Sequence, residues 1–158
     1  HLCDRRQRQM CIRDRDNIYS ENAIINHILN RKIEYCNNNG LSIKCMVCGE
    51  LKGVSDYDIH IILENLLDNA IEAALKAVNK RISVDIYSDE QAMVIKISNT
   101  TEENVLKNNP EMNTTKKDNS YHGYGIRNVS ELVKKNNGTI EYIQLGVDIV
   151  QCRVLLML

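Results

Sequence analysis

Four side chains with oxygen-bearing ends share one stripe of an otherwise apolar helical segment. Residues 64–73 read Glu-Asn-Leu-Leu-Asp-Asn-Ala-Ile-Glu-Ala. At about 100° per residue, the stripe contains Asn65, Asp68, Asn69 and Glu72. Asn and Asp disfavour helix interiors because their short side chains compete for the backbone. Carboxamide and carboxylate oxygens suit Mg²⁺, which usually binds together with substrate phosphates, so the stripe predicts a magnesium site. A solvated polar helix face is the alternative.

A glycine-rich turn leads into another predicted helix. Residues 121–129 read Tyr-His-Gly-Tyr-Gly-Ile-Arg-Asn-Val, and Gly123 and Gly125 open the amphipathic pattern. Free N–H groups and the positive end of the dipole make a helix N-terminus an anion site, so this start favours a phosphate. A plain turn is the alternative. The segment is not a Walker loop, because no Gly-Lys-Ser/Thr follows it.

Together the two segments resemble the N box and the second glycine box of the GHKL ATPases, the superfamily of gyrase, MutL and the sensor histidine kinases. The similarity is closest to the Agr-type peptide-sensing kinases, which combine this helix with a Thr-Thr-Lys lid segment and a His-Gly-x-Gly box. The three elements occur here in the family's order, at Asn65–Ala73, Thr114–Lys116 and His122–Ile126. One departure concerns adenine: Asn99-Thr100 stands where most histidine kinases have Asp-x-Gly, although Asn is typical of the Agr-type branch.

The resemblance implies a role for each matching residue. Asn69 corresponds to the Mg²⁺ ligand, and Asn65 stands where gyrase-like ATPases present a water-activating Glu. An amide cannot take a proton, so hydrolysis should be poor and ATP preserved for transfer to a histidine. Asn99 would accept a hydrogen bond from the adenine amino group, and Lys116 or Lys117 would reach the γ-phosphate as a point charge. The other predicted nucleotide contacts are Asp68, Glu72, Thr115, His122, Gly123, Gly125 and Ile126.

Helices and strands are expected to alternate around these segments. Helical spacing predicts helices at 22–38, 56–78 and 124–136, and strand patterns predict strands at 41–47, 82–87, 93–98, 139–145 and 149–157. The expected fold is a two-layer α/β sandwich, with three helices on one face of a mixed, mainly antiparallel sheet. This agrees with the Bergerat (GHKL) fold that the resemblance implies. Residues from about 100 to 122 lack periodicity, and so long a loop is usually functional, here as a lid over ATP.

The N-terminal residues 1–15 resemble a translated sequencing-library adapter and are expected to be a non-native tail. A native basic helix is the alternative. Without the tail, the net charge falls from −1 to −4, because five Arg and two Asp are removed. No basic patch for nucleic acid then remains. Residues 16–158 are expected to form a single domain, and no apolar run approaches the roughly 18 residues of a membrane span.

The sequence predicts the catalytic, ATP-binding domain of a bacterial two-component sensor histidine kinase, with ATP and Mg²⁺ as cofactors. The phosphoacceptor histidine is expected on a dimerisation helix upstream of Tyr19, and a response regulator is the expected downstream partner. The full-length protein is expected to be a membrane-anchored homodimer that senses a quorum signal, with this domain in the cytoplasm. A non-catalytic nucleotide-binding module, anti-sigma-like or a degenerate kinase, is one alternative. Another is a metal-binding domain through Cys45 and Cys48, although reduced thiols are expected for all cysteines outside the tail.

Overall fold

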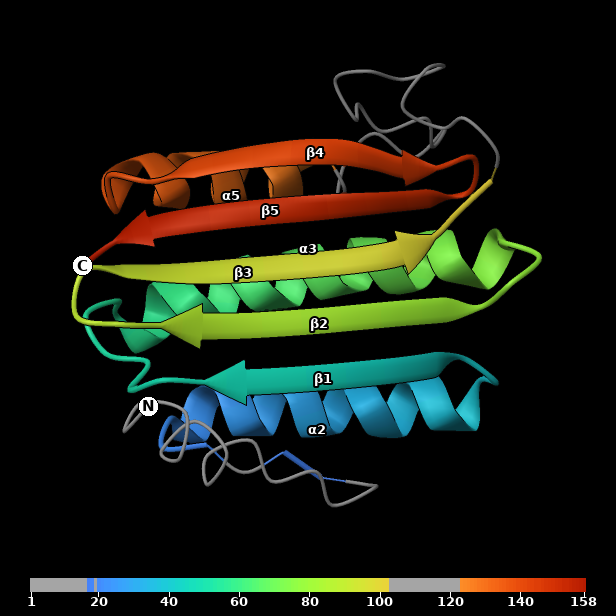
Figure 1. Cartoon of the computed structure of the whole chain (residues 1–158), viewed down its shortest axis with the longest axis horizontal. Helices are drawn as coiled ribbons and strands as arrows, with labels where there is room; N and C mark the ends of the chain where they lie inside the picture. Colours follow the sequence, from blue (N-terminus) through green and yellow to red (C-terminus); the bar gives the residue numbers. More distant parts are fainter. Residues whose placement is uncertain (1–16, 19, 103–122) are drawn as a thin grey trace, which may run out of the picture.

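Three helices cover one face of a five-stranded sheet in the computed structural model, which describes residues 17, 18, 20–102 and 123–158 (Figure 1). The helices are α2 (Ala23–Asn38), α3 (Asp56–Lys76) and α5 (Gly123–Lys135). The strands are β1 (Ser42–Cys48), β2 (Arg81–Ser88), β3 (Ala92–Thr100), β4 (Thr139–Gly146) and β5 (Ile149–Met157). Each element ends within about two residues of its predicted bounds, because the helical and strand periodicities that define them are strong. The predicted α/β sandwich is confirmed.

The sheet is mixed and mainly antiparallel, as predicted. Its strand order is β1-β2-β3-β5-β4. The β1–β2 pair is parallel, and the other three pairs are antiparallel. The last two strands form a hairpin, and β5 inserts between β3 and β4. This order puts β3 in the middle of the sheet (Figure 1).

Strand β3 directs alternate side chains toward the helices. Met93, Ile95 and Ile97 are buried in the core, whereas the residues between them are only half-buried. Because side chains alternate between the two faces of a strand, Asn99 continues the helix-facing row at the end of β3. The strand pattern therefore places a polar amide where the apolar core ends, on the side of the sheet that the helices cover.

Helix α3 lies between α2 and α5 (Figure 1). Its N-cap is Ser55, whose Oγ accepts a hydrogen bond from the Asp58 N–H at 3.1 Å. The apolar side chains that α3 buries are Ile59, Ile62, Leu63, Leu66, Leu67, Ala70, Ile71 and Ala74. This burial fixes the rotation of α3, so its polar stripe faces away from the sheet. No helix in the described part of the chain is long and apolar enough to cross a membrane.

A buried carboxylate joins the start of α3 to the end of α5. Asp58 is 1% exposed, and its Oδ2 accepts hydrogen bonds from Lys135 Nζ at 2.9 Å and Asn136 Nδ2 at 3.0 Å. The hydrogen bond from Asn136 and the nearby charge of Lys135 lower the pKa of Asp58, although burial opposes this shift. Because α5 runs back along α3 from this anchor, the glycine-rich start of α5 comes to lie beside the middle of α3.

Replacing Asp58 with Asn should destabilise the fold by about 1–2 kcal/mol at pH 7. A hydrogen bond to a charged group is worth about 1.5–3 kcal/mol, and the exposure of Lys135 reduces that value. The folded pKa of Asp58 lies below the ordinary value of about 3.9. Its contribution is therefore present above that pH and is lost as the pH falls through the folded value. Urea unfolding at pH 7 and near pH 2 measures this difference between the variant and the parent.

Asp56 is the matched control, because it is an exposed carboxylate in the same first turn of α3. Asp56→Asn should change the free energy of unfolding by less than about 0.5 kcal/mol. Equal stability of Asp58→Asn and the parent at pH 7 would show that the Asp58 anchor does not stabilise the contact between α3 and α5.

Candidate functional site

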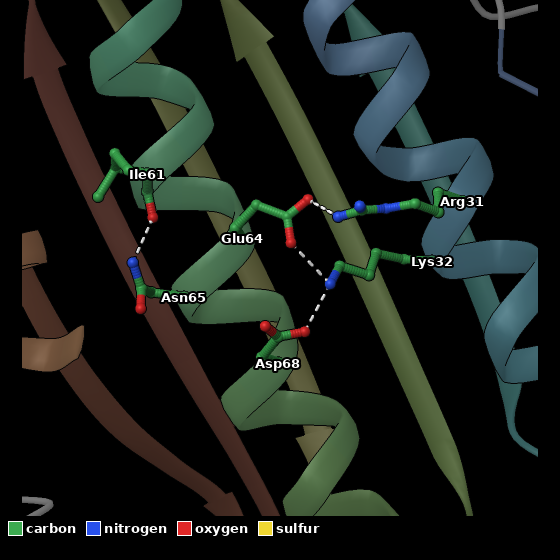
Figure 2. A network of polar contacts seen from close by, with 6 residues as sticks. All are labelled: Arg31, Lys32, Ile61, Glu64, Asn65 and Asp68. Carbon is green, nitrogen blue, oxygen red and sulfur yellow. Dashed lines mark hydrogen bonds and ion pairs between the residues drawn. The ribbon is translucent and has the colours of Figure 1, made fainter. Parts of the chain in front are cut away.

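The predicted polar stripe of α3 divides between two sides of the helix. In Figure 2, Asn65 lies on one side, whereas Asp68 and its neighbour Glu64 point to the other side, toward α2. Asn69 is exposed, one helical turn after Asn65. Glu72 is half-buried and pairs with Lys76 at 3.5 Å. The stripe therefore presents amides toward α5 and solvent, and carboxylates toward α2 or along α3.

Asn65 meets the glycine-rich start of α5. Its Nδ2 donates a hydrogen bond to the Ile61 carbonyl oxygen at 2.7 Å, which fixes the amide and leaves Oδ1 directed away from that carbonyl. A Cβ added to Gly125 would lie 2.6 Å from this Oδ1. Only glycine permits so close an approach. The structure thus brings together two predicted site residues that are far apart in the sequence.

Helix α5 begins at Gly123, so the predicted anion site is a helix N-terminus. Ile126 is half-buried within its first turn, and Val129 and Val133 anchor the helix in the core. The first N–H groups of a helix have no partner within the helix and carry the positive end of its dipole. The start of α5 can therefore bind an anion beside the Asn65 amide.

Two cations of α2 hold the carboxylates on the other side of α3. The Lys32 Nζ lies 2.8 Å from Glu64 Oε2 and 2.5 Å from Asp68 Oδ1, and Arg31 also bonds to Glu64 (Figure 2). Burial opposes the charge on Lys32, but its bonds to Asp68 and Glu64 outweigh this and raise its pKa. Burial likewise opposes the charge on Glu64, and the bond to Lys32 nevertheless lowers its pKa. Lys32 and Glu64 are therefore both charged at neutral pH.

Lys32 is not among the site residues predicted from the sequence. The available signal was its position on the apolar face of α2, four residues after Ile28 and four before Cys36. Lysine is seldom buried unless it is paired, so a lysine at a core position of a helix predicts a buried partner. The pattern alone could not show that the partners were Glu64 and Asp68.

Asn99 is half-buried at the end of β3, on the helix-facing side of the sheet. Its Nδ2 donates to the carbonyl oxygen of Thr100 at 2.9 Å. This bond leaves the Asn99 Oδ1 as the group that can accept a hydrogen bond from a ligand. The predicted adenine contact is therefore positioned as an acceptor at the edge of the apolar core.

Most of the predicted lid, about 100–122, lies outside the described residues, and so do Thr115, Lys116, Lys117 and His122. The first lid residues are part of the sheet. Thr100 ends β3, and its Oγ1 accepts from the Arg81 N–H at 3.0 Å. The Thr101 N–H donates to the Asp148 carbonyl oxygen at 2.8 Å. The start of the segment is thus fixed at the end of β3.

The cysteines do not form a metal site in the described part of the chain, where no group of three or more His, Cys, Asp and Glu side chains could hold a metal ion. Cys36, Cys45 and Cys152 are free, as predicted. Cys48 is disulfide-bonded, so the prediction of a reduced thiol is wrong there. Burial raises the pKa of Cys45 to about 12, and its thiol is therefore protonated and a poor ligand at neutral pH.

A comparison with protein families matches a model described as "GHKL domain" over residues 54–155. This range contains α3, β2, β3, the loop, α5 and most of the final hairpin. The match therefore includes the Asn65 stripe and the glycine-rich start of α5. No curated protein matches the chain.

Solved structures with the same fold include histidine kinases. The nucleotide-free catalytic domain of histidine kinase ThkA has a TM-score of 0.67 and 17% identity, over 88% of this chain and 93% of that domain. The mycobacterial sensor histidine kinase MprB has a TM-score of 0.58 and 15% identity, over 84% and 93% of the two chains. The Acinetobacter baumannii histidine kinase AdeS has a TM-score of 0.60 and 16% identity, and the match covers 85% of this chain but only 63% of AdeS. At these identities the likeness shows the fold.

Replacing Gly125 with Ala should damage the site more than the fold. The added Cβ displaces the Asn65 amide, but the backbone at position 125 is helical, a conformation that alanine favours over glycine. We expect the melting temperature to change by only a few degrees, while affinity for a nucleoside triphosphate falls at least about tenfold, the effect of losing roughly 1.4 kcal/mol. Calorimetric titration measures the affinity. Unchanged affinity would show that the Asn65–Gly125 contact is outside the binding site.

Proposed function

This chain belongs to the GHKL domain family, and from that premise we propose that it is the ATP-binding catalytic domain of a bacterial two-component sensor histidine kinase. The observation that carries the proposal is the approach of Asn65 Oδ1 to Gly125. This contact places a helix lined with amide oxygens against a helix N-terminus. Such a pairing suits a magnesium-bound polyphosphate, because amide oxygens are metal ligands and helix N-termini bind phosphates.

We assign each described residue of the site a proposed contact with Mg·ATP. Asn69 is the proposed metal ligand, and the Asn65 amide lies beside the phosphates. The first N–H groups of α5 receive phosphate oxygens, and Asn99 accepts from the adenine amino group. When bound, Mg²⁺ neutralises charge on the phosphates and helps to orient them. The donor set fits this ion, since Asn65 and Asn69 offer the hard oxygen ligands that it prefers.

The site is arranged for phosphoryl transfer and not for hydrolysis. Asn65 cannot accept a proton, so it cannot activate water as a general base. The neighbouring carboxylate, Glu64, is bonded to Lys32 and Arg31 on the α2 side of the helix. Neither side chain is available as a base beside the phosphates, which supports a role that preserves ATP for another acceptor.

The proposed acceptor is a histidine on a separate dimerisation helix of the same protein. His27 is exposed on α2, which lies across α3 from α5, so we do not propose it as the acceptor. A response regulator would then receive the phosphoryl group. Agr-type sensing of a quorum peptide, a membrane-anchored homodimer and a cytoplasmic location of this domain are further parts of the proposal, supported by the sequence motifs.

A second candidate is a nucleotide-binding module that does not transfer phosphate. The amide at Asn99, in place of the carboxylate found in most histidine kinases, favours this candidate, because a neutral acceptor binds the adenine amino group less strongly. The two functions differ in their products: only the kinase yields an acid-labile phosphohistidine when the full-length protein is incubated with γ-labelled ATP.

Asn69→Ala should abolish binding of Mg·ATP and leave the fold intact. The Asn69 side chain is exposed, so its removal costs no core packing. Titration calorimetry with a non-hydrolysable ATP analogue and Mg²⁺ measures the affinity. Asn37→Ala is the matched control, because Asn37 is an exposed asparagine of α2 and should bind the analogue like the parent. Unchanged affinity of Asn69→Ala would contradict the metal site on α3.

Asn99→Asp should tighten ATP binding several-fold. A hydrogen bond to a charged group contributes roughly 1.5–3 kcal/mol, against about 0.5–1.5 kcal/mol for a neutral pair, so the expected gain is about 1 kcal/mol. GTP presents a carbonyl oxygen in place of the amino group, and the variant should reject it more strongly than the parent does. Competition titrations with both nucleotides measure the ratio of ATP affinity to GTP affinity in the variant and in the parent. Equal ATP and GTP affinities in both proteins would favour the non-catalytic module.

A further inference from the structure

Lys32 is the one buried lysine or arginine in the part of the chain that the structure describes. It is 8% exposed, and its Nζ bonds to both Glu64 and Asp68. These carboxylates belong to successive turns of α3, and each immediately precedes an amide of the site, Asn65 or Asn69. A single cation of α2 therefore holds the α3 turns that carry both amides.

The charges of this cluster balance. Arg31 and Lys32 provide two positive charges, and Glu64 and Asp68 provide two negative charges. Without Lys32, the cluster would carry one net negative charge on the helix that presents Asn65 and Asn69. The Asp68 side chain is 63% exposed, so without Lys32 it would be an uncompensated charge on the surface of the helix that carries Asn69. An uncompensated negative charge on this helix weakens the binding of an anion.

Stability alone does not explain a lysine at this position. Well-packed hydrophobic residues often replace buried ion pairs without loss of stability, and the neighbours of Lys32 on this face of α2 are apolar, including Ile28, Leu29 and Cys36. An apolar residue in place of Lys32, with apolar or amide partners on α3, would satisfy the packing. What it would not supply is a charge that cancels the carboxylates beside the site.

We propose that Lys32 is a positioning residue of the nucleotide site, which keeps Glu64 and Asp68 neutralised on the α2 side of α3. A polyphosphate can then approach Asn65 and Asn69 without repulsion. This inference rests on the proposed function, because it assumes that the phosphates bind beside those amides. Its distinguishing property is the dependence on metal: Mg²⁺ itself shields the phosphates, so Lys32 matters most when Mg²⁺ is absent.

The test is the affinity for ADP, measured by titration calorimetry with Mg²⁺ and again with a chelator. Lys32→Met should weaken metal-free ADP binding about tenfold and Mg·ADP binding about threefold, since one uncompensated charge acts more strongly on the unshielded phosphates. Lys32→Arg keeps the charge and should bind like the parent under both conditions. Lys44→Met is the matched control, because it removes the same charge from an exposed position of β1, on the alternate row that points away from the helices.

Neutralising a carboxylate of the cluster should restore the metal-free ADP affinity that Lys32→Met loses. In the double variant Lys32→Met/Glu64→Gln the cluster is again neutral, and metal-free ADP affinity should return to within about twofold of the parent. Glu64→Gln alone leaves one excess positive charge and should tighten metal-free binding about threefold. This single variant is nearly isosteric, so it tests the inference even where Lys32→Met does not fold.

The outcomes separate the inference from the function on which it rests. A parent protein that binds neither ADP nor ATP would contradict the proposed function. A parent that binds, with Lys32→Met reducing both affinities equally and Glu64→Gln changing neither, would show that Lys32 only supports the fold and would overturn the inference. A metal-dependent loss, with recovery in the double variant, would establish it.

Discussion

The close approach of Asn65 to Gly125 is the contact on which the arrangement of the site depends. Two larger structural constraints together produce this contact. Burial of the apolar arc of α3 against the sheet fixes how far α3 is rotated, and the bonds of Asp58 to Lys135 and Asn136 fix where α5 starts along it. A side chain at position 125 would clash with the Asn65 amide, where the two helices meet at the site. The glycine is therefore a geometric requirement of the contact between the helices, independent of any phosphate.

Helix α3 separates two kinds of polar chemistry. Its α5 side presents the neutral Asn65 amide, and its α2 side presents Glu64 and Asp68, which Arg31 and Lys32 neutralise (Figure 2). Carboxylates are strong metal ligands but repel phosphates, whereas amides bind a metal without adding negative charge. The separation lets one short helical segment contain acidic side chains and still offer a site for an anion.

Strong periodicities made the fold predictable from the sequence. The alternation in β3 and the helical spacing in α3 are determined by local chain geometry, so both elements and the outward stripe could be placed. The same spacing could not divide the stripe, because it took Asp68 and Asn65 as neighbours on one face. Which of them faces α2 depends on the positions of Lys32 and Gly125, and these follow from packing between distant segments. The bonds of Asp58 to α5 could not be predicted for the same reason, because they join residues 77 and 78 positions apart in the sequence.

Under the proposed function, two features of the site both disfavour the hydrolysis of ATP. An amide at position 65 removes the residue best placed to activate water, and the bonds from Lys32 and Arg31 occupy the carboxylate that precedes it in the sequence, that of Glu64. Either feature alone would leave a route to hydrolysis: an acidic residue 65 could take the proton directly, and an unpaired Glu64 could take it through an intervening water. The two routes are blocked by different elements, α3 itself and α2. An acidic side chain at position 65 would open only the direct route, and loss of the α2 cations would open only the route through water. Under the proposed function, the cation pair of α2 would therefore limit hydrolysis of ATP as well as balance the charge of the neighbouring helix.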